Sequence, residues 1–382
     1  MLNSLYIKNY RNLAELRINS AGRVNLITGK NNTGKSTILE AIALYITKSD
    51  LKLIYQLLDE RGENYKLFPN NKNATEINIK ALSSLFTNRS INFDKKKAIL
   101  IGGVIGKTLF GEDDFYEDSI GIRFVNYFDK VVEIPEEVTV NMRIKTERII
   151  VENIPDELLA DYRIGLEIRV GNRSSILTLE EDRPYKFGIR GNGKTENFQF
   201  IRTRNIEKEN NGLLWDNITL TDKEQFVIEA LKIIEPNVER IAFIEESPRE
   251  RTAVIKLSNS NNILPLKSMG DGINRILTII LALVNSDNGF LLIDEFENGL
   301  HHSVQEKLWQ IIFNLSEKLN VQIFATTHSE ECISAFEYVM NNSSKSFDGK
   351  LIRLENNDGI IKQSEFNKDE LRIANENDID LR

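Results

Sequence analysis

Apolar and polar positions follow a clear pattern at the start of the chain. Leu5, Ile7 and Tyr10 lie in one extended run, and residues 24–27 form a second, more apolar run. From residue 38 to 46, apolar side chains recur at a spacing of three to four, which is typical of one helix face. The first fifty residues therefore predict strands, a loop and a helix.

A second alternation of strands and helices occupies the later part of the chain. Residues 290–293 and 321–325 are short apolar runs, and between them apolar residues recur at helical spacing from 304 to 315. Such a strand-helix-strand unit is typical of a parallel sheet. Between residues 50 and 230, polar and apolar residues alternate instead, notably at 138–144 and 164–170, which predicts antiparallel strands with one solvated face.

These patterns predict an α/β protein with a mixed or parallel core sheet and a β-rich inserted lobe. We expect residues 1–49 and 198–382 to form two parts of one domain, with residues 50–197 as the lobe. We find no internal repeat, sustained heptads or low-complexity segment.

Composition narrows the functional classes. The 382 residues are 41% hydrophobic and 28% charged, and no apolar run approaches the roughly 18 residues of a membrane span. The alternating first residues are unlike a secretory signal, so we expect a cytoplasmic protein without membrane contact. The single cysteine, Cys332, is predicted to be a small core residue. A net charge of −8 argues against a uniformly basic surface but leaves a local DNA-binding patch open.

A phosphate-binding loop is predicted at residues 29–36, which match G-x-x-x-x-G-K-[ST] between an apolar strand and a helix. In this motif the backbone amides wrap phosphates, Lys35 neutralises the β- and γ-phosphates, and Ser36 reaches Mg²⁺. The alternative is a glycine-asparagine loop that only caps the helix. The predicted ATP-binding residues are Gly29, Asn31, Asn32, Thr33, Gly34, Lys35, Ser36 and Thr37.

Residues 188–195 match the same motif, but a short segment interrupted by Pro184 precedes them and a strand pattern follows. We interpret Gly191-Asn192-Gly193 as a hairpin turn and predict no nucleotide there.

Two acids, Asp294 and Glu295, end the apolar run at 290–293, in the Walker B arrangement. At the carboxyl end of a parallel strand, Asp294 would hold Mg²⁺ and Glu295 would activate the attacking water. His328 follows the next predicted strand and would meet the γ-phosphate at the same sheet edge. The alternatives are two helix-capping acids and a polar loop histidine. His301 and His302 lack metal-ligand spacing and are predicted to be interface or capping residues.

The segment Leu266-Lys267-Ser268-Met269-Gly270-Asp271-Gly272 precedes a long apolar helix. Ser268 and Asp271 have the spacing of a capping box. Equally, Ser268 and the glycines could present the helix amino terminus to a γ-phosphate held by a second subunit. The sequence leaves both interpretations open.

In this order, the phosphate loop, residues 268–272, Asp294-Glu295 and His328 resemble the ABC-type ATPases of the SMC, RecF and overcoming-lysogenization-defect (OLD) group. The sequence is most similar to those of bacterial AAA/OLD-like ATPases at residues 5–12, 29–32 and 294–301, and in the tail at 369–371 and 379–382. The resemblance covers about residues 1–48 and 198–382.

The resemblance implies a Mg²⁺-dependent ATPase that works as a homodimer or higher oligomer. Each site would combine the phosphate loop, Asp294, Glu295 and His328 of one subunit with residues 268–272 of the other. It also implies a nucleotide-proximal role for Arg11 and a magnesium role for Gln199.

Departures from the family pattern shape the functional expectation. Ser-Met-Gly-Asp-Gly replaces the fuller transporter signature, and there are no heptads for an SMC coiled coil. Too little chain follows residue 340 for the Toprim nuclease domain of OLD proteins, so we expect any nuclease on a separate effector chain, as in antiphage systems such as PARIS. The alternatives are a RecF-like DNA clamp, with salt-sensitive DNA binding, and a scaffold that scarcely hydrolyses ATP.

Overall fold

The computed structural model divides the chain into two compact units, one of residues 1–4, 18–39 and 195–382 and the other of residues 5–17 and 40–194. The proposed limits of the inserted lobe, 50 and 197, stay a prediction. Residues 188–195, and positions 138 and 140 of one predicted strand, lie outside the described residues. The described residues are 1–66, 74–107, 113–115, 119–135, 142–152, 162–179, 196–203, 208–247, 250–260, 262–343, 347–377 and 379–382.

The first unit is built on a six-stranded sheet in the order β11-β15-β16-β3-β17-β18. The first five strands run parallel, and β18 is antiparallel to β17. This confirms the predicted α/β class with a mixed sheet. The strands are β3 (Val24–Gly29), β11 (Phe198–Ile201), β15 (Phe290–Ile293), β16 (Gln322–Thr326), β17 (Gly349–Asn357) and β18 (Ile360–Phe366).

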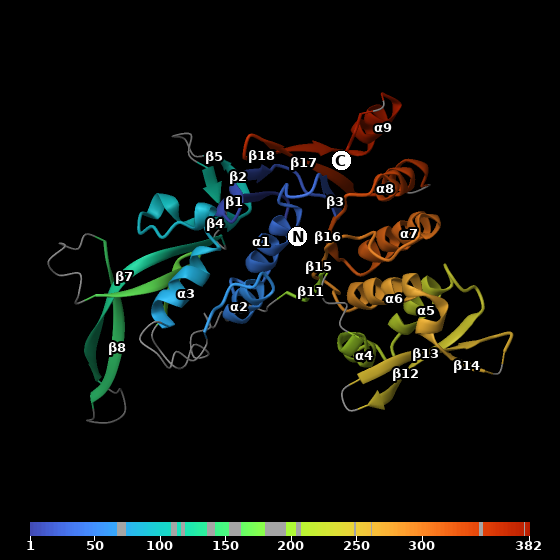
Figure 1. The fold of residues 1–382 in the computed structure, drawn as a ribbon, viewed down its shortest axis with the longest axis horizontal. Coiled ribbons are helices and arrows are strands. Elements are labelled where there is room, and N and C mark those ends of the chain that lie inside the picture. The colour runs from blue at the N-terminus through green and yellow to red at the C-terminus, as the bar shows by residue number, and fades with distance from the viewer. Residues whose placement is uncertain are drawn as a thin grey trace. The chain divides into compact units, whose positions relative to one another are not determined.

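Helices follow the strands as the periodicity predicts. Helices α6, α7 and α8 lie side by side, each in contact with the next or with the sheet (Figure 1). None of the helices in the described parts of the chain is long and apolar enough to cross a membrane. Helix α1 (Lys35–Ile46) begins in this unit and continues into the second from residue 40. The other helices of this part are α6 (Asp271–Val284), α7 (His302–Lys318), α8 (Glu330–Asn342) and α9 (Lys368–Glu376).

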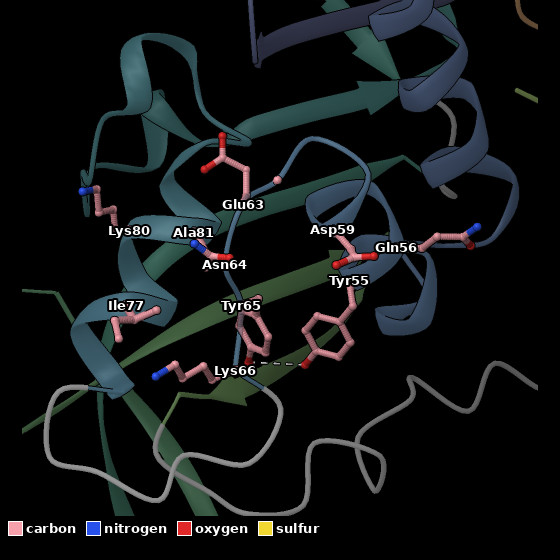
Figure 2. Close-up of a pocket in the computed structure, with 11 residues that line it drawn as sticks. Tyr55, Gln56, Asp59, Glu63, Asn64, Tyr65, Lys66, Ile77, Lys80 and Ala81 are labelled. Atoms are coloured by element: carbon pink, nitrogen blue, oxygen red, sulfur yellow. Dashed lines mark hydrogen bonds between the residues drawn. The ribbon is translucent and has the colours of Figure 1, made fainter. Parts of the chain in front are cut away.

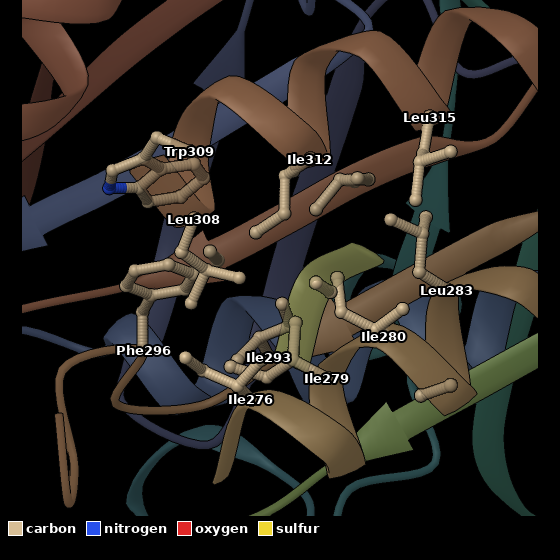
Figure 3. Close-up of a cluster of buried hydrophobic side chains, with 14 of the residues drawn as sticks. Ile276, Ile279, Ile280, Leu283, Ile293, Phe296, Leu308, Trp309, Ile312 and Leu315 are labelled. Atoms are coloured by element: carbon tan, nitrogen blue, oxygen red, sulfur yellow. The ribbon is translucent and has the colours of Figure 1, made fainter. Parts of the chain in front are cut away.

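The core of this unit lies between α6, α7 and the sheet (Figure 3). Ile276 and Ile280 of α6 and Leu308 and Ile312 of α7 are fully buried. Burial of such side chains stabilises the fold by about 1.5–3 kcal/mol each. Cys332 of α8 belongs to the same core, which confirms its predicted place.

A smaller antiparallel sheet, in the order β12-β13-β14, leads into α6. Helices α4 and α5 pack between this sheet and α6. Its last strand continues through a 3₁₀ turn, η5 (Leu266–Met269), directly into α6. The other elements are α4 (Lys208–Asp216), α5 (Lys223–Leu231), β12 (Val238–Ser247), β13 (Glu250–Leu257) and β14 (Ile263–Pro265).

The second unit holds a sheet in the order β10-β9-β7-β4-β1-β2, with β8 also paired to β7. Strand β9 is antiparallel to both β7 and β10, as predicted for residues 164–170. Two helices, α2 (Leu51–Asp59) and α3 (Ala74–Ser83), belong to this unit and were not predicted. The strands of this sheet are β1 (Leu5–Tyr10), β2 (Leu13–Ile18), β4 (Ile99–Gly102), β7 (Ile120–Pro135), β8 (Met142–Val151), β9 (Arg163–Val170) and β10 (Arg173–Thr178). Strands β5 (Val104–Lys107) and β6 (Asp113–Phe115) pair with each other in a separate antiparallel sheet.

Candidate active site

The sheet order of the first unit brings the predicted nucleotide residues together. Strands β15, β16 and β3 are parallel neighbours, so their carboxyl ends share one edge of the sheet. The phosphate loop follows β3, Asp294 and Glu295 follow β15, and His328 follows β16. Ligands of open parallel sheets bind at such an edge.

The loop between β3 and α1 has the conformation that a phosphate cradle requires. Gly29 has φ of 143° and Gly34 has φ of 91°, which favour glycine. Thr33 Oγ1 donates to the Lys30 carbonyl at 2.8 Å and closes the turn. Lys35 Nζ donates to the carbonyls of Gly29 (2.6 Å) and Lys30 (3.0 Å). Asn31 and Asn32 are exposed, so the loop offers its outer face to a ligand.

Burial lowers the pKa of Lys35 from its ordinary value, and the carboxylates of Glu297, Asp294 and Glu295 partly oppose this shift. The ammonium group therefore lies in a half-buried site that is already rich in negative charge.

Three hydroxyl groups surround the carboxylate of Asp294. Ser36 Oγ donates to Asp294 Oδ1 at 2.9 Å, and Thr326 Oγ1 donates to the same oxygen at 2.7 Å. Thr203 Oγ1 lies 3.3 Å from Asp294 Oδ2. Thr203 follows β11 and Thr326 ends β16, the two strands that flank β15. The carboxylate is thereby held in one orientation beside the phosphate loop.

Glu295 occupies a tight turn directly after β15. Its φ of 49° is left-handed, a conformation that costs a glutamate about 1 kcal/mol. Its amide donates to Thr326 Oγ1 at 2.9 Å. The next side chain, Phe296, is fully buried and stacks on Trp309 of α7 with ring centroids 4.0 Å apart (Figure 3). This anchor holds the turn, while the Glu295 carboxylate forms no hydrogen bond to the described residues.

His328 lies against a third acid of the same turn. Its Nδ1 is 2.9 Å from Glu297 Oε1, and its backbone amide donates to the same oxygen at 2.9 Å. His301 is the N-cap of α7, since its Nδ1 accepts from the Ser303 amide at 3.3 Å. This confirms the capping prediction for His301.

The capping-box interpretation of residues 268–271 is wrong. Ser268 Oγ donates to the Pro265 carbonyl at 2.7 Å, and no side chain of the described residues caps α6. The N-cap is Gly270, whose φ of 96° is left-handed and whose Cα faces open space. Within the described ranges, the first amides of α6 therefore have no side-chain acceptor, and Asp271 lies in that first turn. Gly272 packs closely on the Gly299 carbonyl.

Arg275 of α6 is a functional candidate that the sequence reasoning missed. It is 1% exposed, and its guanidinium donates to the carbonyls of Asp294 (3.1 Å) and Glu295 (2.8 Å). Burial lowers the pKa of Arg275, and the nearby acids partly oppose this. The side chain thus ties the helix after residues 268–272 to the backbone of the two Walker B acids.

Gln199 is a predicted residue that the structure does not bring to this cluster. Gln199 lies within β11 opposite Leu291, and the hydroxyl that reaches Asp294 from that strand is Thr203. Arg11, in the second unit, is buried and pairs with Glu40 at 2.7 Å. The nucleotide role of Arg11 stays a prediction.

The donor set fits a magnesium ion. Hydroxyl and carboxylate oxygens are the ligands that Mg²⁺ prefers, and it commonly takes only one or two carboxylates together with phosphate oxygens. Ser36 and Asp294 supply such a pair, with Thr203 beside them. Within the described ranges there is no group of three or more His, Cys, Asp or Glu side chains that could hold a metal by themselves.

Residues 1–333 match the family model of the AAA ATPase domain. The chain belongs to this family. It is an ATPase of the P-loop class, with the mixed-sheet α/β fold predicted from its motifs. ATP is its substrate.

Relatives of this AAA ATPase include a Helicobacter pylori protein named ATP/GTP phosphatase, which is 24% identical over 403 residues and aligns over 100% of both chains. The Methanocaldococcus jannaschii protein MJECL10 is 35% identical over 101 residues, which are 24% of this chain and 46% of that protein. MJECL11 of the same organism is 33% identical over 116 residues, 30% of this chain and 99% of that protein.

Two solved SMC head domains also align with this ATPase. An SmcHead bound to the C-winged helix domain of ScpA gives a TM-score of 0.45 at 12% identity, covering 96% of this chain and 97% of that one. The head domain from Thermotoga maritima gives 0.44 at 13% identity, covering 96% and 99%.

The second unit contains a cavity of about 880 Å³ between α2, α3 and the segment at 62–66 (Figure 2). Tyr55 and Tyr65 stack in it with centroids 4.5 Å apart. Charged side chains of both signs surround this aromatic pair, so the cavity offers polar and apolar contacts to a ligand or partner side chain. They are Asp59, Glu63, Lys66 and Lys80.

Proposed function

We propose that two copies of this ATPase enclose ATP between them and act as a Mg²⁺-dependent conformational switch. The observation that carries the proposal is the open amino terminus of α6. Gly270 replaces a capping side chain, and the free helix amides can meet a γ-phosphate that the phosphate loop of another subunit holds. Arg275 supports a link from this helix to the turn that carries Glu295.

Each site residue has a chemical role in this proposal. Lys35 and the loop amides at Asn31 to Gly34 hold the phosphates, and Ser36 and Asp294 would hold Mg²⁺, which neutralises charge on the β- and γ-phosphates. Glu295 orients the attacking water and takes its proton, which its unpaired carboxylate favours. His328 contacts the γ-phosphate or the attacking water. When hydrolysis removes the γ-phosphate, this contact is lost, and the loss signals the change to the rest of the subunit.

The output of the switch is proposed to be a change in how a separate effector chain is held. The resemblance to antiphage ATPases motivates this role, and a Toprim-type nuclease is the effector that it suggests. The cavity around Tyr55 and Tyr65 is the candidate contact for such a partner in the second unit.

The experiment that tests the proposal measures mass in solution with Mg²⁺ and ATP for the wild type and for Glu295→Gln, together with phosphate release. We expect the variant to lose hydrolysis and to accumulate as a dimer, because ATP stays bound between subunits. Equal phosphate release from both proteins would overturn the role of Glu295. If ATP changed the mass of neither protein, the proposed enclosure of ATP between two subunits would be wrong, and only the ATPase activity would remain.

A further inference from the structure

The turn after β15 contains an acid, Glu297, for which the hydrolysis scheme above gives no role. Glu295 and Glu297 flank Phe296, whose ring is locked against Trp309 in the core. Because Phe296 is fixed, both glutamates are held in place at the same sheet edge. Burial lowers the pKa of Lys35, and among the carboxylates of Glu297, Asp294 and Glu295 that of Glu297 opposes this shift most strongly.

Glu297 makes two contacts to one residue. Its Oε1 accepts from the His328 backbone amide and lies 2.9 Å from the His328 ring nitrogen Nδ1. The Glu297 side chain is 12% exposed, whereas that of His328 is 51% exposed. A half-exposed imidazole is thus held from behind by a mostly buried carboxylate.

This contact decides which ring nitrogen is available for chemistry. An ionised carboxylate only accepts hydrogen bonds, so Nδ1 of His328 must carry the hydrogen between them. Nε2 is then the ring nitrogen left for other partners, and the bond fixes the plane of the ring as well. Carboxylates that orient an imidazole in this way contribute to catalysis in other enzymes without touching the substrate.

The second oxygen of Glu297 supports a role beyond packing. Glu297 Oε2 is buried and has no hydrogen-bond partner among the described residues. A buried carboxylate oxygen without a partner destabilises the fold, because its lost hydration is not replaced. A residue that served only to cap the segment before α8 would need neither the charge nor this oxygen, because Ser329 already caps α8 through the Cys332 amide.

We propose that Glu297 is a positioning residue that fixes the His328 ring, with Nδ1–H toward the carboxylate and Nε2 toward the nucleotide. The proposal rests on the role of His328 in the proposed function. In this role Glu297 acts through the His328 ring and needs no contact with ATP or the attacking water.

A double-mutant cycle tests this coupling. We expect Glu297→Gln to lower kcat about 10- to 100-fold with little change in KM, because the amide can rotate and donate to Nδ1, which releases the tautomer. In a His328→Ala background the same change is expected to have almost no further effect, since two residues that act as one unit are not additive. Glu331→Gln is the matched control, since Glu331 is an exposed acid near His328 that pairs with Ser329 instead.

The ring tautomer gives a readout that a purely structural role would not change. The chain has three histidines, so the imidazole ¹⁵N signals of His328 can be assigned by comparison with His328→Ala. The wild-type spectrum is expected to show hydrogen on Nδ1, and Glu297→Gln to show a mixture of tautomers. The wild-type spectrum tests the proposal even if the variant does not fold.

Three results would overturn the proposal. They are equal losses from Glu297→Gln in both backgrounds, a wild-type ring with hydrogen on Nε2 alone, and full turnover in His328→Ala. The last result would remove the role of His328 while leaving Glu295 and the dimer switch to their own test.

Discussion

Glu40 and Glu295 are both acids near charged partners, but their surroundings differ. In the second unit, Glu40 accepts from Arg61 at 2.6 and 3.0 Å and from Tyr10 at 3.1 Å, and it pairs with Arg11 at 2.7 Å. In the first unit, the Glu295 carboxylate forms no hydrogen bond to the described residues, and its backbone is in a left-handed conformation.

The difference separates a buried acid that stabilises the fold from a half-buried acid that is left available for chemistry. Every oxygen of Glu40 is satisfied within the fold, and burial with the nearby Glu40 charge raises the pKa of Tyr10 above its ordinary range. Removing one charge from such a buried ion pair is strongly destabilising, because the other charge is left without a counterion. The turn at Glu295 keeps a carboxylate unpaired at the cost of backbone strain, as functional sites often do.

The largest expected effect is on turnover. Glu295→Gln should lower kcat about 10³-fold, because the amide cannot accept a proton from water. Its free energy of unfolding should change by less than about 0.5 kcal/mol, since no bond of the fold is lost. Phosphate release and urea denaturation of the same preparation measure both quantities. A variant that loses turnover because it is largely unfolded would contradict the chemical role of Glu295.

Glu40→Gln should show the reverse behaviour. Removing this charge leaves Arg11 buried without a counterion and should lower the free energy of unfolding by about 2–4 kcal/mol. Turnover per folded molecule should stay within about twofold of the wild type. Arg89→Gln is the matched control, because its pair with Glu63 is 60% exposed on the arginine side and should contribute less than about 1 kcal/mol.

Gly270→Val should lower turnover about 10- to 100-fold, because its side chain would enter the open space at the amino terminus of α6. Gly359→Val, in the β17–β18 turn, introduces the same residue at φ of 87° and also meets open space. Both should lose about 1–3 kcal/mol of stability from backbone strain. Equal turnover in the two variants would remove the special role of α6.

His301→Ala should have the smallest effect. It removes the N-cap of α7 and should lower the free energy of unfolding by about 0.5–1 kcal/mol. Thermal denaturation measures this change, and kcat should follow the wild type. A larger loss of turnover than of stability would place His301 in the reaction or the subunit interface.

The sequence predicts the strand ends that carry the site but not the contacts between them. Asp294 could be assigned because an apolar run ends there, whereas Thr203 and Thr326 reach it only because β15 lies between β11 and β16. That strand order depends on pairing between distant segments, which local sequence patterns do not predict. Arg275 and Glu297 were missed for a related reason, since each resembles an ordinary polar residue of a helix or turn until its partner is known.

Other parts of the fold escaped prediction for different reasons. Helix α2 carries its apolar residues at helical spacing, at Leu51, Ile54 and Leu58, and Gly62 follows it, so a helical signal was present in the sequence and was missed. The choice between a capping box and a free helix end at Ser268 required the hydroxyl direction, which the spacing alone does not give.

The most direct test of the central claim, a composite site made by two subunits, is complementation between Glu295→Gln and Gly270→Val. Each variant alone should be nearly inactive. In a mixed dimer, one site combines the intact Glu295 of one subunit with the intact Gly270 of the other, so an equal mixture should recover about a quarter of wild-type turnover. Turnover no higher than the sum of the separate variants, in mixtures shown to contain mixed dimers, would contradict the account.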